Sequence, residues 1–418
     1  MTACSEKLQQ VSYVAESTWA EASTDMTGAQ IIPHSAMFDL GGLRRAMIES
    51  TRVVTYKDER PKNIPGAWTG ASFVLEVEMT GHGSTTSGST SAVAVENLIA
   101  WAMGGGASGG TATASASSGT TCSATGTAVA LTTTASATFT AGYMFRTGAA
   151  NDARGNGQWN NVASHATTTL TGMVAYDAAP INADVVYSAV NMYTASNTCA
   201  VASKRFRLLT ADMQVVCHGC FPMSYTLTGY NPGEILKMAI TVGVSWIEPV
   251  SGSFPDTSST AAWTFNPTPV AGGSIVLTSY GATTRTILDC RSLNIAPTIA
   301  TQPIVGYNGA NGYQTVVGAS RTPDQWAVTA IVGAAGSSAT PTYYDLWAAN
   351  TTMHMICSLR IGTGAAVGVY LRKLQWAGPQ PLQTSHNGLN CVELNFVASS
   401  DPAGASEPTR AAVVMGFA

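Results

Sequence analysis

The chain has 418 residues, of which only 11% are charged, and its formal net charge is −4. Soluble domains ordinarily carry about a quarter charged residues, so this surface is mainly hydroxyls, amides and backbone, which suits subunits that cover one another or an extracellular protein. The length predicts two or more domains, and the scarcity of lysine, at six residues, argues against a surface that holds nucleic acid through its phosphates.

The N-terminal part is expected to begin as an extended arm. Residues 1–35 show little periodicity, and the opening "MTACSEKLQQ" lacks the apolar segment of a secretory signal, so we expect a soluble protein made in a cytoplasm. Further on, "SFVLEVEMTG" (72–81) alternates apolar and polar residues, which predicts a strand with one buried face. "AVAVENLIAWAMGG" (92–105) repeats its apolar residues at helical spacing and stops at glycines, which predicts a short helix.

The middle of the chain combines a low-complexity tract with further strands. Residues 104–140 are almost wholly Gly, Ala, Ser and Thr, and as far as Thr127 they lack large apolar side chains that could offset the entropy of ordering. Strand patterns follow, and residues 213–250 predict a hairpin that turns at Asn231-Pro232-Gly233.

The second half repeats the plan of the first, after a linker expected over residues 251–284. "DQWAVTAIVG" (324–333) takes the place of the alternating strand, "PTYYDLWAANTT" (341–352) that of the helix, and residues 368–399 form a hairpin that turns at Asn387-Gly388. We therefore predict an all-β protein with minor α content, built by internal duplication. Its two tandem β-sandwich or barrel domains, each with one flanking helix, are expected over residues 36–250, with an insertion at 104–140, and 285–418, with a C-terminal tail.

Two motifs that could carry chemistry are better explained as parts of this β architecture. Cys217, His218 and Cys220 spell C-H-G-C inside an expected strand, where residues three apart point to opposite faces, and no second ligand pair accompanies them. "GASGG" (106–110) matches a nucleophile elbow around Ser108 but follows a helix where the elbow needs a strand. The eight scattered cysteines form no disulfide framework, so we expect reduced thiols, no metal, no cofactor and no enzymatic activity.

The order of these elements resembles that of the tail tube proteins (major tail proteins) of long-tailed bacteriophages. The resemblance rests on "FVLEVEMTG", "AVENLIAWAMGG" and "CFPMSYTLTGYNPGEILKMAITVGVSW" in the first half, and on "DQWAVTAIVG", "YYDLWAANTT" and "GLNCVELNFVAS" in the second. It implies a structural virion protein of the phage tail, made in the host bacterial cytoplasm, whose rings stack into a hollow tube for DNA ejection.

The resemblance also implies partners. Because tubes of this family are commonly six-fold, a duplicated chain implies a homotrimer that forms a pseudo-hexameric ring by self-assembly. The other implied partners are the tape measure, baseplate and terminator proteins of the tail. DNA would pass through the lumen without specific binding, and no membrane is involved.

Two sets of residues are candidates for roles in such a tube. Glu76 and Glu78 share the polar face of the 72–81 strand and are candidates for lining the lumen, because an acidic wall does not hold DNA; since alternation does not fix which face is inward, an outward position stays open. The long polar loops 56–70 and 306–324 are candidates for ring stacking together with the N-terminal arm, or else are merely flexible surface. The stacking candidates within them are Lys57, Asp58, Glu59, Arg60, Lys62, Asn308, Asn311 and Arg321.

The alternative interpretation is a secreted or surface-exposed all-β binding module of the lectin kind. That class fits the composition, but neither the missing signal nor the pairing of helix and hairpin in both halves. A porin would need a signal peptide and lipid-facing aromatic girdles, and neither is visible in the sequence.

Overall fold

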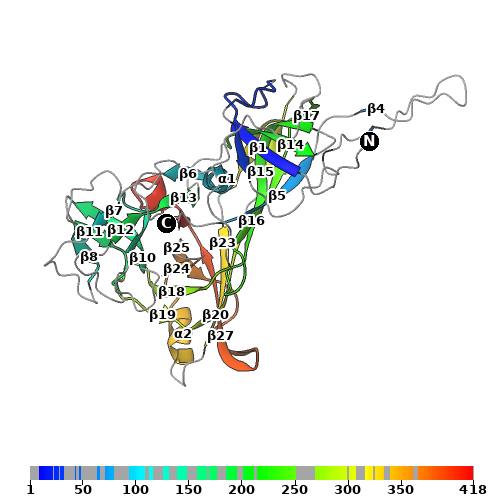
Figure 1. Cartoon of the computed structure of the whole chain (residues 1–418). Coiled ribbons are helices and arrows are strands. Elements are labelled where there is room, and N and C mark those ends of the chain that lie inside the picture. Colours follow the sequence, from blue (N-terminus) through cyan, green and yellow to red (C-terminus); the bar gives the residue numbers. More distant parts are fainter. Residues whose placement is uncertain are drawn as a thin grey trace, which may run out of the picture.

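Strands account for 61% and helices for 8% of the residues described by the computed structural model, which confirms an all-β fold with minor α content (Figure 1). The structure describes residues 9–21, 23–27, 29–32, 43, 47–48, 64–65, 71–79, 94–108, 113–115, 126–130, 139–147, 158–166, 169–176, 185–194, 201–210, 214–250, 269–298, 301–306, 316–322, 325–333, 339–360 and 366–417.

The first large sheet is antiparallel and contains the strands that flank the first helix in sequence. Its order is β2 (Gln30–Ile32), β1 (Gln9–Ala15), β14 (Lys204–Thr210), β15 (Gln214–Thr228), β16 (Lys237–Gly243) and β5 (Ser72–Glu78). A return strand, β17 (Trp246–Pro249), pairs with the first part of β15.

The second large sheet lies in the centre of Figure 1 and is also antiparallel. Its main order is β19 (Ile287–Leu288), β18 (Gly272–Ser279), β24 (Met353–Arg360), β25 (Ala366–Trp376), β27 (Leu389–Ala398), β23 (Gln325–Gly333) and β20 (Cys290–Thr298). The return strand β28 (Val413–Phe417) pairs with β25, and β26 (Gln383–His386) pairs with β27.

The two sheets have the same strand order. β2-β1-β14-β15-β16-β5 corresponds strand for strand to β19-β18-β24-β25-β27-β23, and β17 corresponds to β28. In each sheet the last strand of this order is the one that precedes a helix in the chain: α1 (Ala94–Met103) or α2 (Ala339–Ala348). We call these elements the first unit (β1, β2, β5, α1 and β14–β17) and the second unit (β18–β20, β23, α2 and β24–β28).

A β-bulge occurs at the same place in both units. In the first, the β14–β15 register shifts between Lys204 and Phe206, and Gly219 within the bulge has φ 58°. In the second, the β24–β25 register shifts between Met353 and Met355, and Lys373 has φ 34°. The shared irregularity aligns the two units residue by residue around this point.

The boundaries expected from the sequence need correction. Residues 1–35 were expected to form an arm, but β1 and β2 are integral strands of the first sheet. The expected linker, 251–284, includes β18, which pairs along its whole length with β24. The expected C-terminal tail includes β28, which pairs with β25. The pairing partners of these strands are distant in sequence, so no local pattern shows that the strands belong to the sheets.

The insertion within the first unit is larger than the expected 104–140. Between α1 and β14 the chain forms a six-stranded sheet whose order is β7 (Thr113–Ser115), β12 (Val185–Ser188), β9 (Met144–Thr147), β10 (Gln158–Ala166), β11 (Thr169–Gly172) and β8 (Ala128–Ala130). Two further strands of this segment, β6 (Gly104–Ser108) and β13 (Val190–Thr194), pair with each other, and β13 also pairs with β28. Figure 1 shows the six-stranded sheet on the left, beside the second unit.

The insertion is fixed to the second unit by a tryptophan above two glycines. Gly368 and Gly416 are directly opposite each other in the β25–β28 ladder. A Cβ atom at either position would meet the indole of Trp159 at 2.5 or 2.8 Å. The buried Trp159 therefore packs directly on backbone, which only glycine permits.

One large hydrophobic core joins the two units. It includes Phe73 and Phe206 of the first sheet, Leu98 of α1, and Trp326 and Phe396 of the second sheet. The insertion has a smaller core of its own around Phe139, Phe145 and Tyr176. Two short hairpins, β3 (Met47–Ile48) with β4 (Ile64–Pro65) and β21 (Thr301–Val305) with β22 (Val316–Arg321), and the helix α3 (Glu407–Arg410) complete the described elements.

Candidate assembly interface

The joint between the two units is formed by the tip of the β15–β16 hairpin. This hairpin runs from the first sheet toward the strands of the second (Figure 1). Its turn, residues 229–236, is tight: Gly229 and Gly233 have positive φ, and the Glu234 amide donates to the Asn231 carbonyl. The turn expected at Asn231-Pro232-Gly233 is thereby confirmed. We call residues 229–236 the first tip.

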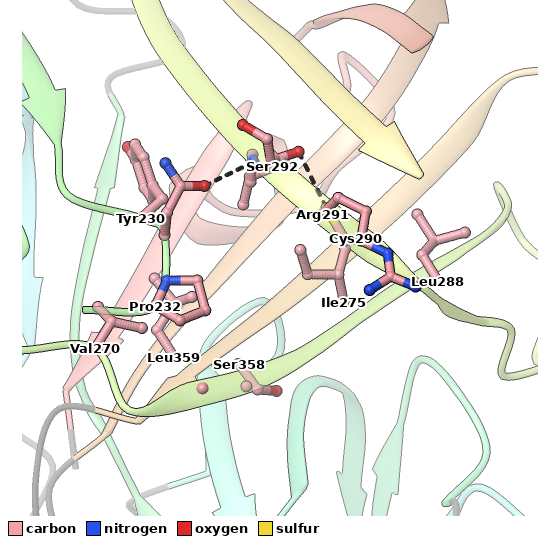
Figure 2. Close-up of a pocket in the computed structure, with 14 residues that line it drawn as sticks. Tyr230, Pro232, Val270, Ile275, Leu288, Cys290, Arg291, Ser292, Ser358 and Leu359 are labelled. Carbon is pink, nitrogen blue, oxygen red and sulfur yellow. Dashed lines mark hydrogen bonds between the residues drawn. The ribbon is translucent and has the colours of Figure 1, made fainter. Parts of the chain in front are cut away.

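A pocket lies between the first tip and the second unit, and residues of both line it. Figure 2 shows Tyr230, Pro232 and Val270 on one side of it and Leu288, Cys290 and Ser292 on the other. The pocket exists because β19 and β20 are consecutive in the chain yet lie at opposite ends of the sheet order, so the sheet curls until its edges approach. The tip lies where the edges meet.

Four hydrogen bonds hold the first tip to β20 of the second unit and to Val270, which lies just before β18. The Gly233 amide donates to the Val270 carbonyl (2.8 Å), and the Val270 amide donates to the Glu234 carbonyl (2.7 Å). The Leu293 amide donates to Asn231 Oδ1 (3.2 Å), and the Tyr230 hydroxyl donates to the Ile295 carbonyl (3.4 Å). Backbone groups make most of these bonds, so the joint depends on strand geometry more than on particular side chains.

Apolar burial accompanies these bonds. Tyr230 is 4% exposed, and its neighbours Leu236, Val270, Leu293 and Leu359 are buried as well. Burial raises the pKa of the Tyr230 phenol well above its ordinary value, so the hydroxyl stays protonated and keeps its role as donor. Sequence reasoning identified the turn but missed this tyrosine; the signal was an aromatic residue next to a turn, where a surface hairpin usually carries polar residues.

The corresponding tip of the second unit has a different environment. The β26–β27 hairpin turns at Asn387 and Gly388, whose φ values of 51° and 77° are those of a type I′ turn. Residues 382–390 of this hairpin are exposed or half-exposed, including Leu382 at 52% and Leu389 at 53%. We call residues 382–390 the second tip; Figure 1 shows its hairpin at the lower end of the molecule, away from the first sheet.

The two lumen candidates lie on the strand at the end of the first sheet. The alternation expected for 72–81 is confirmed, because Phe73, Leu75 and Val77 of β5 are buried, while Glu76 and Glu78 point to the opposite face. Lys237 of β16 lies between them, with its Nζ 3.0 Å from Glu76 Oε1 and 4.0 Å from Glu78 Oε1. One ammonium therefore partly neutralises the two carboxylates.

The structure gives Arg321 a different role from the one expected. It is buried, and its guanidinium donates to the carbonyl of Ala102 (2.8 Å), near the C-terminal end of α1, where the helix dipole favours a cation. Gly104, with φ 75°, ends the helix so close to the guanidinium that a Cβ there would meet it at 2.3 Å. Arg321 is thus a helix-capping residue and not a surface residue for stacking. The other stacking candidates, Lys57, Asp58, Glu59, Arg60, Lys62, Asn308 and Asn311, lie outside the described residues.

The C-H-G-C motif lies within β15, as expected, but its two cysteines share a face. Because of the bulge at Gly219, three residues of β15 span two of β14, so Cys217 and Cys220 both point into the main core. The Cys220 thiol donates to the Cys217 carbonyl (3.3 Å), and burial raises the pKa of Cys220 well above its ordinary value. Both thiols are free. The expectation of opposite faces was wrong because a single extra residue reverses the alternation.

Among the described residues, no group of three or more His, Cys, Asp or Glu side chains could hold a metal ion. Ser108, the candidate nucleophile, ends strand β6, and the next described element is another strand, β7, where a nucleophile elbow has a helix. No helix in the described parts of the chain is both long and apolar enough to cross a membrane.

No protein-family model matches the chain, and no curated protein matches it either.

Proposed function

We propose that this chain is a tail tube protein of long-tailed bacteriophages, a structural subunit that assembles with itself into stacked rings around a channel for DNA. The observation that carries the proposal is the shared strand order of the two units. In each unit one helix follows the strand that comes last in this order, β5 or β23, and one long hairpin is present. A chain built as two like units joined end to end already contains the repeating contact that a ring of such units needs. Three chains would supply six units.

The charge distribution supports a channel that does not retain DNA. Every Lys or Arg that faces phosphate strengthens binding by releasing counterions, and the chain has six lysines and a net charge of −4. In the described region, Lys237 and Lys373 each lie beside a carboxylate, at 3.0 and 2.8 Å. A wall of this composition would let the duplex slide.

Electron microscopy of the purified protein tests the proposal. Negative-stain images should show rings or striated tubes with a central hole. A monodisperse monomer at all protein concentrations would contradict the proposal, as would compact closed oligomers without a hole. In the phage, the protein would lie in the virion tail and contact the tape measure, baseplate and terminator proteins.

Ring stacking is assigned to the segments 56–70 and 306–324, which were expected to be loops but include β4 (Ile64–Pro65) and β22 (Val316–Arg321). Deletion of residues 58–66 should leave rings intact but prevent their elongation into tubes, because long loops between strands usually carry interactions. The measurement is tube length by electron microscopy, with circular dichroism to show that the variant is folded. Tubes of normal length from the deletion variant would end this assignment.

A further inference from the structure

We propose that the second tip, residues 382–390, docks onto the first unit of another copy of this chain. The contact would lie at the end of the β1–β14 ladder where Gln9 pairs with Thr210. The inference rests on the proposed self-assembly and deepens it by assigning the contact between chains. Within one chain, the first tip contacts the second unit. We use this contact as the template for the contact between two chains.

The template can be transferred because the two units align through their bulges. Ala15 pairs with Lys204 beside the first bulge, and Ser279 pairs with Met353 beside the second. Six residues further along each ladder, Gln9 pairs with Thr210 in the first unit and Gly273 pairs with Leu359 in the second. The Gly273–Leu359 pair lines the pocket whose other wall includes Tyr230, Asn231 and Pro232 of the first tip.

The Gln9–Thr210 pair is therefore the position in the first unit that corresponds to the β18–β24 wall of this pocket. The buried Leu209 lies at this end of β14, paired with Gln10 of β1. By the same correspondence, the second tip is the hairpin that would occupy it.

The second tip has the properties of an unused docking element. It is a rigid hairpin, because β26 and β27 pair from His386↔Leu389 to Gln383↔Val392, so it loses little conformational entropy on binding. Two leucines about half-exposed lie on either side of its turn, whereas the first tip buries its aromatic and aliphatic residues in the second unit. A second copy is the partner that this comparison specifies, since the β1–β14 ladder of the first unit corresponds to the β18–β24 wall of the pocket beside the first tip.

Such a contact is head-to-tail. The tip belongs to one unit and its receiving ladder to the other, so each chain would offer one tip and one receiving site. Repetition of a head-to-tail contact yields a ring if the rotation closes and an open filament if it does not.

The first test replaces the exposed leucines. Size-exclusion chromatography with light scattering of Leu382→Asp with Leu389→Asp should show loss of the assembly formed by the wild-type protein, leaving a folded species at the monomer mass of 43.1 kDa. The matched control is Val305→Asp on β21, where an aliphatic residue 63% exposed lies outside both tips; this variant should still form rings. If the double variant assembles like the wild type, the docking proposal is wrong while ring assembly stands. A wild-type protein that stays monomeric would instead contradict the proposed function itself.

The second test identifies the receiving site. Under mild oxidation, a mixture of Asn387→Cys and Gln9→Cys proteins should give a disulfide-linked dimer that contains one chain of each kind, and neither variant alone should give it. Cross-linking of Asn387→Cys with itself would show a symmetric tip-to-tip contact and overturn the proposal. Assembly in the mixture without any mixed disulfide would overturn the choice of receiving site.

Discussion

Each bulge buries one histidine and one arginine, with their positions exchanged between the units. In the first unit Arg205 lies on β14 and His218 on β15; in the second, His354 lies on β24 and Arg372 on β25, at the matching positions. Both guanidinium groups donate to backbone carbonyls, Arg205 to Asp25 (2.6 Å) and Arg372 to Ala411 and Pro408 (both 3.1 Å). The exchange preserves one buried cation and one imidazole at each bulge.

Burial lowers the pKa of both imidazoles to about 4, and the nearby arginine charge acts in the same direction. His218 is stacked on Trp246 with ring centroids 3.9 Å apart, and its Nδ1 is 2.9 Å from the Glu21 carbonyl, so the neutral ring must donate there. The Glu248 carboxylate, 3.6 Å from Nε2, favours the charged form but is about half exposed, and burial outweighs it. Both rings are neutral at pH 7.

We therefore expect stability to depend on pH through these rings. Because the folded-state pKa lies below the unfolded value of 6.5, the stabilisation is complete above pH 6.5 and is lost as the pH falls toward 4. Each ring contributes at most about 1.4 kcal/mol of unfolding free energy per pH unit in this range. Urea unfolding at pH 7 and pH 5 should show a smaller loss for His218→Phe than for the wild type.

The control is His386→Phe, at a half-exposed position of the second tip, which should leave the pH dependence unchanged. Equal losses for His218→Phe and the wild type would show that the imidazole does not control this part of the stability.

Gly219 provides a second test at the scale of single residues. Its φ of 58° disfavours other residues, and a Cβ would lie 2.4 Å from Ser245 Oγ and 2.7 Å from Ala20 Cβ. Gly219→Ala should lower the free energy of unfolding by roughly 2–4 kcal/mol, through backbone strain and overpacking together. The control is Gly281→Ala, where φ is 84° but nothing lies within 4 Å of the new Cβ, so strain acts alone. Similar losses in the two variants, measured by denaturant unfolding, would exclude crowding as the cause.

The two corresponding helices differ in how they are covered. Every residue of α1 from Val95 to Met103 is buried except Asn97, which is half-buried, and the insertion strands β6 and β13 lie beside it. In α2, Tyr344 and Asp345 are exposed, and Tyr343, Leu346 and Trp347 are half-buried. α1 is thus a core helix, whereas α2 lies at the surface.

This difference predicts unequal costs for the same substitution. Leu98→Ala in α1 should lower the free energy of unfolding by about 2–5 kcal/mol, because it leaves a cavity in a closed core. Leu346→Ala in α2 should cost less, roughly 1–2 kcal/mol, since the side chain packs against the rim of the core and is only partly buried. The measurement is the free energy of unfolding in denaturant, with the protein unassembled. Equal losses in the two variants would contradict the assignment of α1 to the core.

Elements with a strong local pattern could be predicted from the sequence, and elements that depend on distant partners could not. The alternation in β5, the glycine end of α1 and the turns at Pro232-Gly233 and Asn387-Gly388 are local signals, and the structure contains each of them. Strands such as Thr113–Ser115 are short and built of small polar residues, so only their pairing with distant strands defines them. The contact of the first tip could not be predicted for the same reason. No residue near Tyr230 in the sequence indicates that its hydroxyl bonds to Ile295.

At the scale of the whole molecule, the proposed tube makes a prediction about Glu76 and Glu78. Replacing both by lysine converts two negative charges and one positive charge around Lys237 into three positive charges. If this face lines the channel, Glu76→Lys with Glu78→Lys should leave tubes assembled but slow DNA release from triggered phage, because phosphate contacts retain the duplex.

The control makes the same change in net charge elsewhere. Asp345→Lys on α2 with Glu393→Lys on β27 alters two exposed carboxylates outside β5, and should leave the rate of release unchanged. Equal slowing by both double variants would mean that total charge and not the position of β5 is responsible; no slowing by either would place Glu76 and Glu78 away from the channel.

The covalent link between the two units also determines how an assembly would respond to dilution. The joint at Tyr230 and Val270 forms within one chain, so the local concentration of its partners is set by the length of the connecting chain and not by the amount of protein in solution. A similar contact between two chains is weakened by the free-energy cost of the translational and rotational freedom that the chains lose when it forms. Diluting the protein would therefore separate whole chains while every internal joint remained closed, and the two-unit chain, rather than the single unit, would be the smallest particle in equilibrium with the assembly.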